Sequence, residues 1–454
     1  MKIILVIPGT SRTKRLESTF PFSIENLGVA YLLSSLNRAG LHALVVDGYA
    51  DHLSPATTAE QAIGLLCEDD LVGVSVLQHT QTAARDVIAA IRAAGFTGPV
   101  VCGGWGATLA PAETLRFTGA DCLLTGEADH SFPLLAHRVA TGTSTSEIPG
   151  IVHASDPTHG CPSSVFTSTL DTLPWPTHYC FRPERHEDFS APVPILGSRG
   201  CAWSRCTFCS VPTFYHGNPW RYRSPESLVA EMQHFHDTLG QSSFFFVDDD
   251  FMGTKTRGRV RATALAQQLM DSKLDLDFSF DCRVSDFEPF LFSQLRQAGL
   301  RRVFLGIEAG NDSSLRRFQK GHTVVDVRQT IRGLQALGID VLPGYITFEP
   351  FLTIDDLIAS IEFLLTDLAF AGGSAHLLRT ALVPEYGTML WTDIAKAGLL
   401  TGTFPHYGFV FREPEVAVVV ERIKEYLESV PALTSPAAML ADIQRITNAR
   451  RPLA

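Results

Sequence analysis

The first 145 residues alternate short apolar runs with segments of helical periodicity. The apolar runs, rich in branched side chains, predict strands at residues 2–7, 43–46, 72–77, 99–102 and 121–125. Between them, apolar residues recur every three or four positions, which predicts helices at residues 25–39, 58–66, 82–94 and 112–118. Because such alternation builds a parallel sheet covered on both faces, we predict a doubly wound, Rossmann-like α/β domain over residues 1–145.

The same alternation resumes near residue 192. It predicts strands at residues 194–197, 243–247, 277–281, 302–306 and 341–346, with a last strand beginning at residues 376–378. Helices are predicted at residues 224–236, 261–270, 287–298, 325–337 and 354–365. Polar residues follow several of the strands, as in α/β barrels, whose active sites lie at the carboxyl ends of the strands. We therefore predict a partial (β/α)6 barrel over residues 192–400.

Two further segments complete the predicted domain plan. Residues 146–191 are rich in Pro, Ser, Thr and His and are typical of an ordered linker between domains. Residues 401–454 show helical apolar spacing at 416–430 and 437–446. This last part predicts a short helical C-terminal segment.

The loops that follow the predicted strands of the first domain are candidates for ligand binding, because doubly wound sheets bind ligands at the carboxyl ends of their strands. These loops contain Ser75, Leu77, Gly103, Gly104, Trp105, Gly126 and Glu127. Glycines let a bulky ligand approach the backbone, although the Gly103-Gly104 pair is equally typical of a tight turn. No G-x-G-x-x-G motif follows the first strand, so a dinucleotide is not expected.

Charge and composition exclude several classes of protein. The 454 residues have a formal net charge of −11, which argues against a nucleic-acid surface, because phosphate contacts need clustered Lys and Arg. No apolar run reaches the length of a membrane span, and the first residues are typical of a buried strand rather than of a secretory signal. Nine scattered cysteines, an odd number, favour reduced thiols. We expect a cytoplasmic protein with no membrane partner.

Cys201, Cys206 and Cys209 lie within nine residues, and no fourth cysteine follows nearby. Structural zinc sites and ordinary ferredoxin clusters use four protein ligands. Three cysteines around a four-iron cluster would leave one iron open to bind a cofactor or substrate, so the motif indicates chemistry. A zinc site with His216 as the fourth ligand remains an alternative, and a disulfide is less expected.

Residues 192–390 resemble the radical SAM superfamily. The resemblance is carried by the cysteine loop, Arg223-Ser-Pro-Glu226, Asp248-Asp-Asp-Phe251, Arg283-Val284, residues 298–310 and Lys320-Gly321. Two departures stand out. Four residues separate the first two cysteines where the superfamily usually has three. Residues 344–353 replace the Gly-x-Pro-Gly-Glu stretch of many relatives, so no cofactor contact is assigned there.

The resemblance implies a 4Fe–4S cluster held by Cys201, Cys206 and Cys209, with the methionyl group of S-adenosylmethionine (SAM) on the fourth iron. Cleavage of SAM by one electron would make a 5′-deoxyadenosyl radical. The SAM-binding candidates are Phe208 near the adenine, Arg283 and Glu308 at the ribose or methionyl ends, and Asp248. For the carboxylates, a solvated turn or a paired interior charge is the competing interpretation. No further catalytic residue is assigned.

Residues 100–135 resemble the cobalamin-binding domain that precedes the barrel in many radical SAM enzymes. The seven loop residues named above thereby become cobalamin-binding candidates. The chain has Gly106 where the family often has histidine. It also lacks the Asp-x-His-x-x-Gly signature, which implies that no histidine of that motif lies beneath the cobalt.

The combined resemblance favours a methyltransferase. It implies that a methyl group passes from SAM to cobalt, that the adenosyl radical removes hydrogen from an unactivated carbon of a small-molecule biosynthetic intermediate, and that methylcobalamin delivers the methyl group. An electron donor such as flavodoxin or ferredoxin is also implied. Two alternatives stay open: a radical rearrangement, cyclisation or oxidation without methyl transfer, and an iron–sulfur sensor, which the strand-end acids disfavour.

Overall fold

The computed structural model describes residues 1–10, 25–157, 166–181, 192–217, 220–369, 374–430 and 434–448. It divides the chain into two compact units. The first unit contains residues 1–200, 210–247 and 404–406, and the second contains residues 201–209, 248–403 and 407–454.

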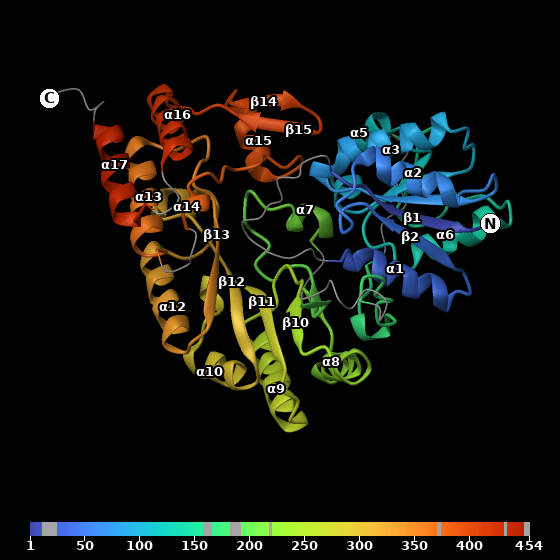
Figure 1. The fold of residues 1–454 in the computed structure, drawn as a ribbon, viewed down its shortest axis with the longest axis horizontal. Helices are drawn as coiled ribbons and strands as arrows, with labels where there is room; N and C mark the ends of the chain where they lie inside the picture. The colour runs from blue at the N-terminus through green and yellow to red at the C-terminus, as the bar shows by residue number, and fades with distance from the viewer. Residues whose placement is uncertain are drawn as a thin grey trace. The chain divides into compact units, whose positions relative to one another are not determined.

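The first unit contains a sheet of six strands in the order β2-β1-β3-β4-β5-β6 (Figure 1). The strands are β1 (Ile3–Ile7), β2 (Ala43–Asp47), β3 (Leu71–Ser75), β4 (Val100–Gly103), β5 (Cys122–Leu124) and β6 (Ile151–His153). The five predicted strands are confirmed and run parallel to one another. Strand β6, within the segment predicted as a linker, was not predicted; it has three residues and pairs antiparallel to β5 at the edge of the sheet.

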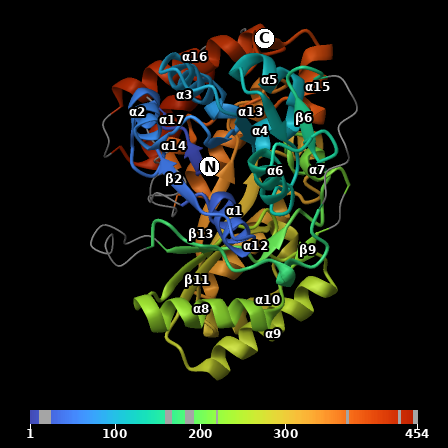
Figure 2. The same ribbon diagram turned by 90° about the vertical axis from the view of Figure 1, so that its right-hand side faces the viewer.

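Helices cover both faces of this sheet, which confirms the doubly wound architecture. They are α1 (Leu27–Arg38), α2 (Pro55–Leu65), α3 (Gln81–Ala93), α4 (Trp105–Leu109), α5 (Pro111–Thr118) and α6 (Ser131–Ala140). Ile4 and Val6 of β1 share one core with α2 and α3, which lie side by side in Figure 2. Leu5, which points to the opposite face, packs with Gly73 and with Phe132 of α6. The period of two in a strand produces this division.

The first unit also contains elements that follow the linker. Strands β7 (Val193–Ile195) and β10 (Ser243–Phe246) pair in parallel, and β8 (Ser198–Arg199) pairs antiparallel to β9 (Arg221–Tyr222). Helices α7 (Val211–Tyr215) and α8 (Pro225–Leu239) lie between them in sequence. Ser224 caps α8 by accepting a hydrogen bond from the Ser227 amide, and Pro225 lies in the first turn, where proline is tolerated.

The second unit contains three neighbouring parallel strands, β11 (Asp277–Arg283), β12 (Leu300–Glu308) and β13 (Asp340–Tyr345). Its helices include α9 (Arg257–Ser272), α10 (Pro289–Gln297), α11 (Asp312–Arg317), α12 (Val324–Ala336) and α13 (Ile354–Thr366). Fully buried Phe278, Phe280 and Phe292 form part of the core between strands and helices. The predicted α/β class is confirmed here too.

The prediction of a last strand beginning at residues 376–378 is wrong. Ser374–Leu377 forms a short helix, α14, and the nearest strand-like pairing is an isolated bridge between Phe348 and Ala381. An apolar run this short does not distinguish a strand from a buried helical turn. The sixth strand–helix unit therefore has no strand at that position.

The C-terminal part is mostly helical, as predicted. It contains α15 (Met389–Lys396), the two-stranded sheet of β14 (Leu400–Thr403) and β15 (His406–Phe409), α16 (Pro414–Ser429) and α17 (Pro436–Asn448). Helix α17 packs along α13 (Figure 1). Among the described residues, none of the helices has the length and apolarity that crossing a bilayer requires.

Candidate active site

The three cysteines of the motif lie on one loop of the second unit, half-buried and free of disulfides. Asp250 organises this loop: its carboxylate accepts a hydrogen bond from the Ala202 amide at 3.1 Å and lies 3.5 Å from the Cys201 sulfur. Burial, followed by the charge of Asp250, raises the pKa of Cys201 to about 12. The thiol therefore keeps its proton until a metal displaces it.

The donor set of the loop is of the kind that holds an iron–sulfur cluster. Within the described part of the chain, no group of three Cys, His, Asp or Glu side chains is arranged to hold one metal ion. Zinc needs all its ligands within about 2.3 Å, whereas a four-iron cluster spreads its thiolate ligands around a larger body. Three thiols on one loop are a donor set that suits such a cluster. The zinc alternative with His216 stays a prediction.

The segment that follows α11 holds the cysteine loop from one side. The Thr207 amide donates to the Phe318 carbonyl at 3.2 Å, and the Trp203 indole donates to the Gln319 carbonyl at 2.8 Å. Gly321 has a φ of +74°, and a Cβ at this position would lie 2.5 Å from the Trp203 ring. Only glycine meets both conditions, which explains the Lys320-Gly321 pair in the sequence.

A buried ion pair joins the end of strand β12 to this segment. Glu308 has a φ of +71°, a left-handed conformation that is strained for a side chain of its kind, and its carboxylate lies 3.0 Å from the Lys320 ammonium. Burial opposes the charge on Lys320, but Glu308 raises the pKa of Lys320 above its ordinary value. The ammonium also lies 5.9 Å from the centre of the Phe208 ring.

Arg283, at the end of strand β11, lies beside Trp203 and Lys320. Its guanidinium lies 4.2 Å above the Trp203 ring and donates to the Lys320 carbonyl at 3.4 Å. Its Nε is buried and has no hydrogen-bond partner among the described residues. A buried donor without a partner is unfavourable, so this atom is suited to receive an acceptor from a ligand.

The structure therefore brings together Phe208, Arg283 and Glu308, three of the four predicted SAM-binding residues. The fourth, Asp248, is buried in a group of acids. Burial first, then the charges of Asp248 and Asp249, raise the pKa of Asp281 well above its ordinary value.

Two residues that sequence reasoning left unassigned stand out. Lys320 is the common partner of the three converging residues, and its place beside glycine in the family-like Lys-Gly pair was the available signal. Asp286 accepts a hydrogen bond from the Arg283 amide at 2.8 Å. Burial and the charge of Asp250 raise the pKa of Asp286 to about 7. The pattern of apolar and polar residues around position 286 gave no indication that Asp286 would lie beside Arg283.

In the first unit, hydrogen bonds from backbone amides connect the three predicted ligand loops. The Val76 amide donates to the Gly103 carbonyl and the Gly106 amide donates to the Val76 carbonyl, both at 2.8 Å. The Gly126 amide donates to the Thr108 hydroxyl at 2.9 Å. The predicted residues Ser75, Leu77, Gly103, Gly104 and Gly126 thus lie at or just after the connected carboxyl ends of β3, β4 and β5.

The glycines of these loops differ in what surrounds them. Gly104 has a φ of +100°, and a Cβ there would lie 3.0 Å from the Val76 carbonyl oxygen, so glycine is required. At Gly103 the nearest atom would be 3.9 Å away, which leaves its α-carbon accessible to a ligand. This open backbone fits a bulky group such as cobalamin.

Glycine is required at position 106 because Gln81 lies directly beside it. A Cβ at Gly106 would lie 2.8 Å from Gln81 Nε2 and 2.9 Å from the Leu77 carbonyl carbon. Gln81 donates to the Thr114 hydroxyl at 2.9 Å, while its own carbonyl oxygen is buried with no hydrogen-bond partner among the described residues. In this chain, therefore, a histidine at position 106 has no room.

The remaining predicted cobalamin contacts already have protein partners. Trp105 stacks on Phe214 with ring centres 4.1 Å apart. The buried Glu127 carboxylate pairs with Arg221 at 2.7 Å and Arg199 at 3.1 Å. These aromatic and basic partners come from distant parts of the sequence, which is why sequence reasoning did not find them.

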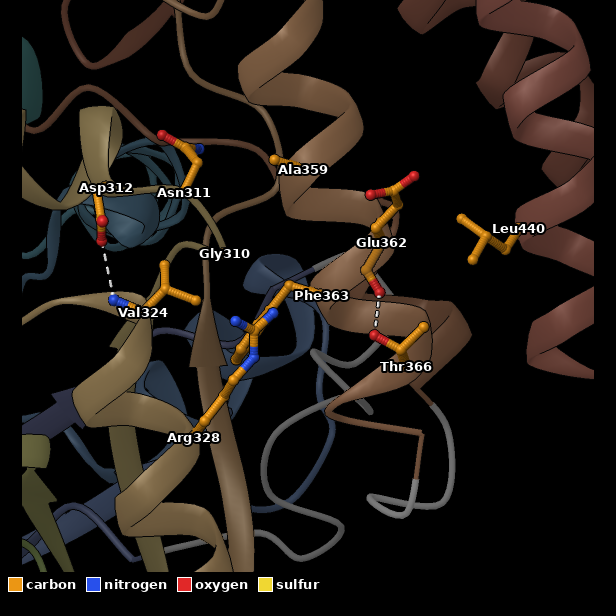
Figure 3. A pocket seen from close by; sticks show the side chains of 10 residues that line it. All are labelled: Gly310, Asn311, Asp312, Val324, Arg328, Ala359, Glu362, Phe363, Thr366 and Leu440. Carbon is orange, nitrogen blue, oxygen red and sulfur yellow. Dashed lines mark hydrogen bonds between the residues drawn. The ribbon is translucent and has the colours of Figure 1, made fainter.

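The hollow drawn in Figure 3 contains none of the predicted site residues. Its volume is about 420 Å³, and its walls include Arg328 of α12, Glu362 of α13 and Leu440 of α17. Arg328 is already paired with Asp367 at 2.9 Å. This hollow therefore does not belong to the group formed by Phe208, Arg283, Glu308 and Lys320.

Two family models match the chain, one for the radical SAM superfamily at residues 195–364 and one for a B12-binding domain at residues 16–136. An uncharacterized methyltransferase of Pyrococcus horikoshii is 27% identical over 416 residues, which are 90% of this chain and 86% of that protein. The hopanoid C-3 methylase of Methylococcus capsulatus is 27% identical over 326 residues, 70% of this chain and 60% of the methylase.

Solved structures share the fold. OxsB, described as a cobalamin-dependent SAM radical enzyme with aqua-cobalamin and SAM bound, superimposes with a TM-score of 0.76 at 16% identity, covering 98% of this chain and 71% of OxsB. The radical SAM methyltransferase TsrM from Kitasatospora setae gives a TM-score of 0.67 at 20% identity, covering 88% of this chain and 76% of TsrM. Both likenesses show that the α/β fold is shared.

Proposed function

The chain belongs to the radical SAM enzymes that carry an N-terminal cobalamin-binding domain, and from this premise we propose that it is a C-methyltransferase. Its substrate would be a small-molecule biosynthetic intermediate with an unactivated carbon. When bound, the cluster with SAM supplies a 5′-deoxyadenosyl radical that removes a hydrogen atom, and cobalamin supplies the methyl group. The residues of the chain bind and orient these groups.

The observation that carries the proposal is the convergence of Phe208, Arg283 and Glu308 around buried Lys320, beside the cysteine loop. We propose that Cys201, Cys206 and Cys209 ligate the cluster. The free Nε of Arg283 would donate to the SAM carboxylate, and Glu308, held in place by Lys320, would accept from the methionyl ammonium or the ribose. A non-catalytic iron–sulfur sensor has no need of such a polar pocket.

The cobalamin-binding residues proposed for the first unit are Ser75, Leu77, Gly103, Gly104 and Gly126 of the connected loops. Trp105 and Glu127 would support these loops through Phe214 and the two arginines rather than through contact with the corrin. The free cysteines and the oxygen-sensitive cluster that we propose favour a location in the reducing cytoplasm.

A second candidate function is a radical rearrangement, cyclisation or oxidation without methyl transfer. The observation in its favour is similarity to 4′-phospho-dehydrooxetanocin synthase of Priestia megaterium, 27% identical over 198 residues, although these cover 39% of this chain and 26% of that protein. Methyl transfer is favoured because the relative with the wider coverage, 90% of this chain, bears the name of a methyltransferase.

Anaerobic reconstitution with iron, sulfide and hydroxocobalamin, followed by quantification of bound metal and corrinoid, tests the proposal. We expect about four irons and one corrinoid per chain, as the domain types require. Four irons without corrinoid would eliminate methyl transfer through cobalt and leave the second candidate. Zinc in place of iron would overturn the assignment of the cysteine loop.

A further inference from the structure

Trp203 lies between the first two cysteines of the motif, where four residues occur and the superfamily usually has three. The next residue, Ser204, has a φ of +47°, a left-handed conformation that is uncommon outside glycine. Beyond it, the Arg205 guanidinium lies 5.2 Å from the centre of the Trp203 ring. The longer loop therefore turns at Ser204 and places Trp203 and Arg205 side by side.

The segment after α11 fixes the indole of Trp203. The indole Nε1 donates to the Gln319 carbonyl at 2.8 Å, and Gly321 leaves room for the ring, since a Cβ there would lie 2.5 Å from it. The indole also borders a surface hollow of about 450 Å³, so a shorter side chain at position 203 would not leave a closed cavity in a core. The orientation of the ring is therefore set locally, by one hydrogen bond and one close packing contact.

The place of the Arg283 side chain depends on this ring. Its guanidinium lies over the ring, 4.2 Å from the ring centre, and donates to the Lys320 carbonyl at 3.4 Å. Within the part of the chain that the structure describes, Arg283 forms no ion pair that would hold it elsewhere. A long side chain without an ion pair has many accessible rotamers, so the contact with Trp203 narrows the choice.

A contact of this kind suits the role proposed for Arg283. An aromatic ring attracts the guanidinium through its electrostatic field and does not occupy the N–H groups as an oxygen acceptor would. The Nε of Arg283 has no hydrogen-bond partner among the described residues, and the planar donor fork of a guanidinium matches the two oxygens of a carboxylate. The ring thus holds the cation and leaves its donors available.

We propose that Trp203 is a positioning residue for SAM binding. It acts through Arg283 and not by contact with the cofactor: the indole holds the guanidinium so that its Nε–H group faces the SAM carboxylate. The longer spacing between Cys201 and Cys206 serves to bring this indole over Arg283. The inference rests on the proposed function, because it takes SAM as the ligand of Arg283.

The test compares the reconstituted parent with Trp203→Leu, which removes the ring, and with Trp203→Phe, which keeps an aromatic face but lacks the indole N–H. Equilibrium dialysis gives the Kd for SAM, and 5′-deoxyadenosine formation with dithionite gives KM for SAM and kcat. We expect Trp203→Leu to raise Kd and KM at least about fivefold and to leave kcat within about twofold, because binding loses support and the chemical step does not. Trp203→Phe should retain the affinity of the parent within about twofold.

Trp175→Leu removes another partly exposed indole and is the matched control, which should bind SAM like the parent. An unchanged Kd in Trp203→Leu, an equal loss in Trp203→Phe or in the control, or a fall in kcat at unchanged Kd overturns the proposal.

A double-mutant cycle separates positioning of Arg283 from general support of the cysteine loop. In an Arg283→Gln background, Trp203→Leu should change the Kd for SAM by less than about twofold, because the group through which the ring acts is absent. A second loss as large as the one measured in the parent would show that Trp203 acts independently of Arg283. Loss of iron from Trp203→Leu after reconstitution would assign the ring to holding the cysteines. Either result overturns the proposal.

The same experiment distinguishes this inference from the proposed function. Absence of 5′-deoxyadenosine in the parent itself would overturn the proposed function. An active parent beside a Trp203→Leu variant with parent-like Kd and KM would overturn the positioning role alone.

Discussion

Lys320 is the side chain on which the predicted SAM-binding residues of the second unit converge. It is buried, it neutralises Glu308, and its carbonyl oxygen accepts from Arg283. The types of residue at strand ends could be predicted from the sequence, because parallel strands present their carboxyl ends on one edge. The cation that organises them could not, because it comes from a loop twelve residues beyond Glu308.

Glu308→Gln should weaken SAM binding to the reconstituted protein at least about tenfold, since hydrogen bonds to charged groups contribute about 1.5–3 kcal/mol and the Lys320 charge would lose its partner. Equilibrium dialysis with SAM measures the effect. Glu425→Gln, on the exposed side of α16, is the control. Unchanged affinity in the Glu308 variant would contradict the assigned role.

Gly321→Ala should reduce both the free energy of unfolding and the iron content after reconstitution. The matched control is Gly338→Ala, because Gly338 has a similar φ of +67° but its added Cβ would meet nothing closer than 3.9 Å. Both variants bear the left-handed backbone penalty of about 1–2 kcal/mol. Only Gly321→Ala adds the clash with Trp203, so equal losses in the two variants would show that the clash does not matter.

Asp286→Asn should stabilise the protein more at pH 8 than at pH 5. The folded pKa of Asp286, about 7, is above its unfolded value. Folding therefore disfavours the ionised form, and this penalty grows as the pH rises from about 4 to 7. Asparagine removes it while keeping an oxygen for the Arg283 amide, for a gain of at least about 1 kcal/mol at pH 8. Denaturant unfolding of the parent and the variant at both pH values measures this gain. A gain that is the same at pH 5 and pH 8 would contradict the raised pKa of Asp286.

At the scale of elements, helix α4 packs closely against Gln81, the first residue of α3, at Gly106. Gly106→Ala should lower the free energy of unfolding and the corrinoid bound per chain, because its Cβ would meet Gln81 and the Leu77 backbone. Gly64→Ala in α2, where nothing lies within 4 Å of the added carbon, should instead stabilise by about 0.5–1 kcal/mol. Corrinoid absorbance after gel filtration and thermal unfolding measure both effects, and full corrinoid binding by Gly106→Ala would refute the steric argument.

Most strands and helices could be predicted because their apolar periods are long and regular. The failures have physical causes. Strand β6 is three residues long, and its pairing with β5 is invisible in the local pattern. The apolar run near residue 376 is too short to choose between helix and strand, and forms α14. The partners of Glu127 lie 72 and 94 positions away in the sequence, at Arg199 and Arg221, beyond any periodicity.

At the scale of the whole molecule, the two compact units differ from the predicted domains. The first unit extends to residue 200 and takes in residues 210–247, so β7 and β10 belong to it. Ion pairs from Glu127 and Asp129 to Arg199 tie the start of the predicted barrel to the first sheet. The boundaries at residues 145, 191 and 400 remain predictions, since composition indicates linkers but not which unit a segment packs on.

The central claim is that the three cysteines hold the iron–sulfur cluster, and that the residues around Lys320 hold SAM beside it so that SAM is cleaved. The most direct measurement is 5′-deoxyadenosine formation by the anaerobically reconstituted chain with SAM and dithionite, alongside Cys206→Ala. We expect 5′-deoxyadenosine from the parent and none from the variant. A parent that holds four irons and binds SAM yet forms no 5′-deoxyadenosine would contradict it.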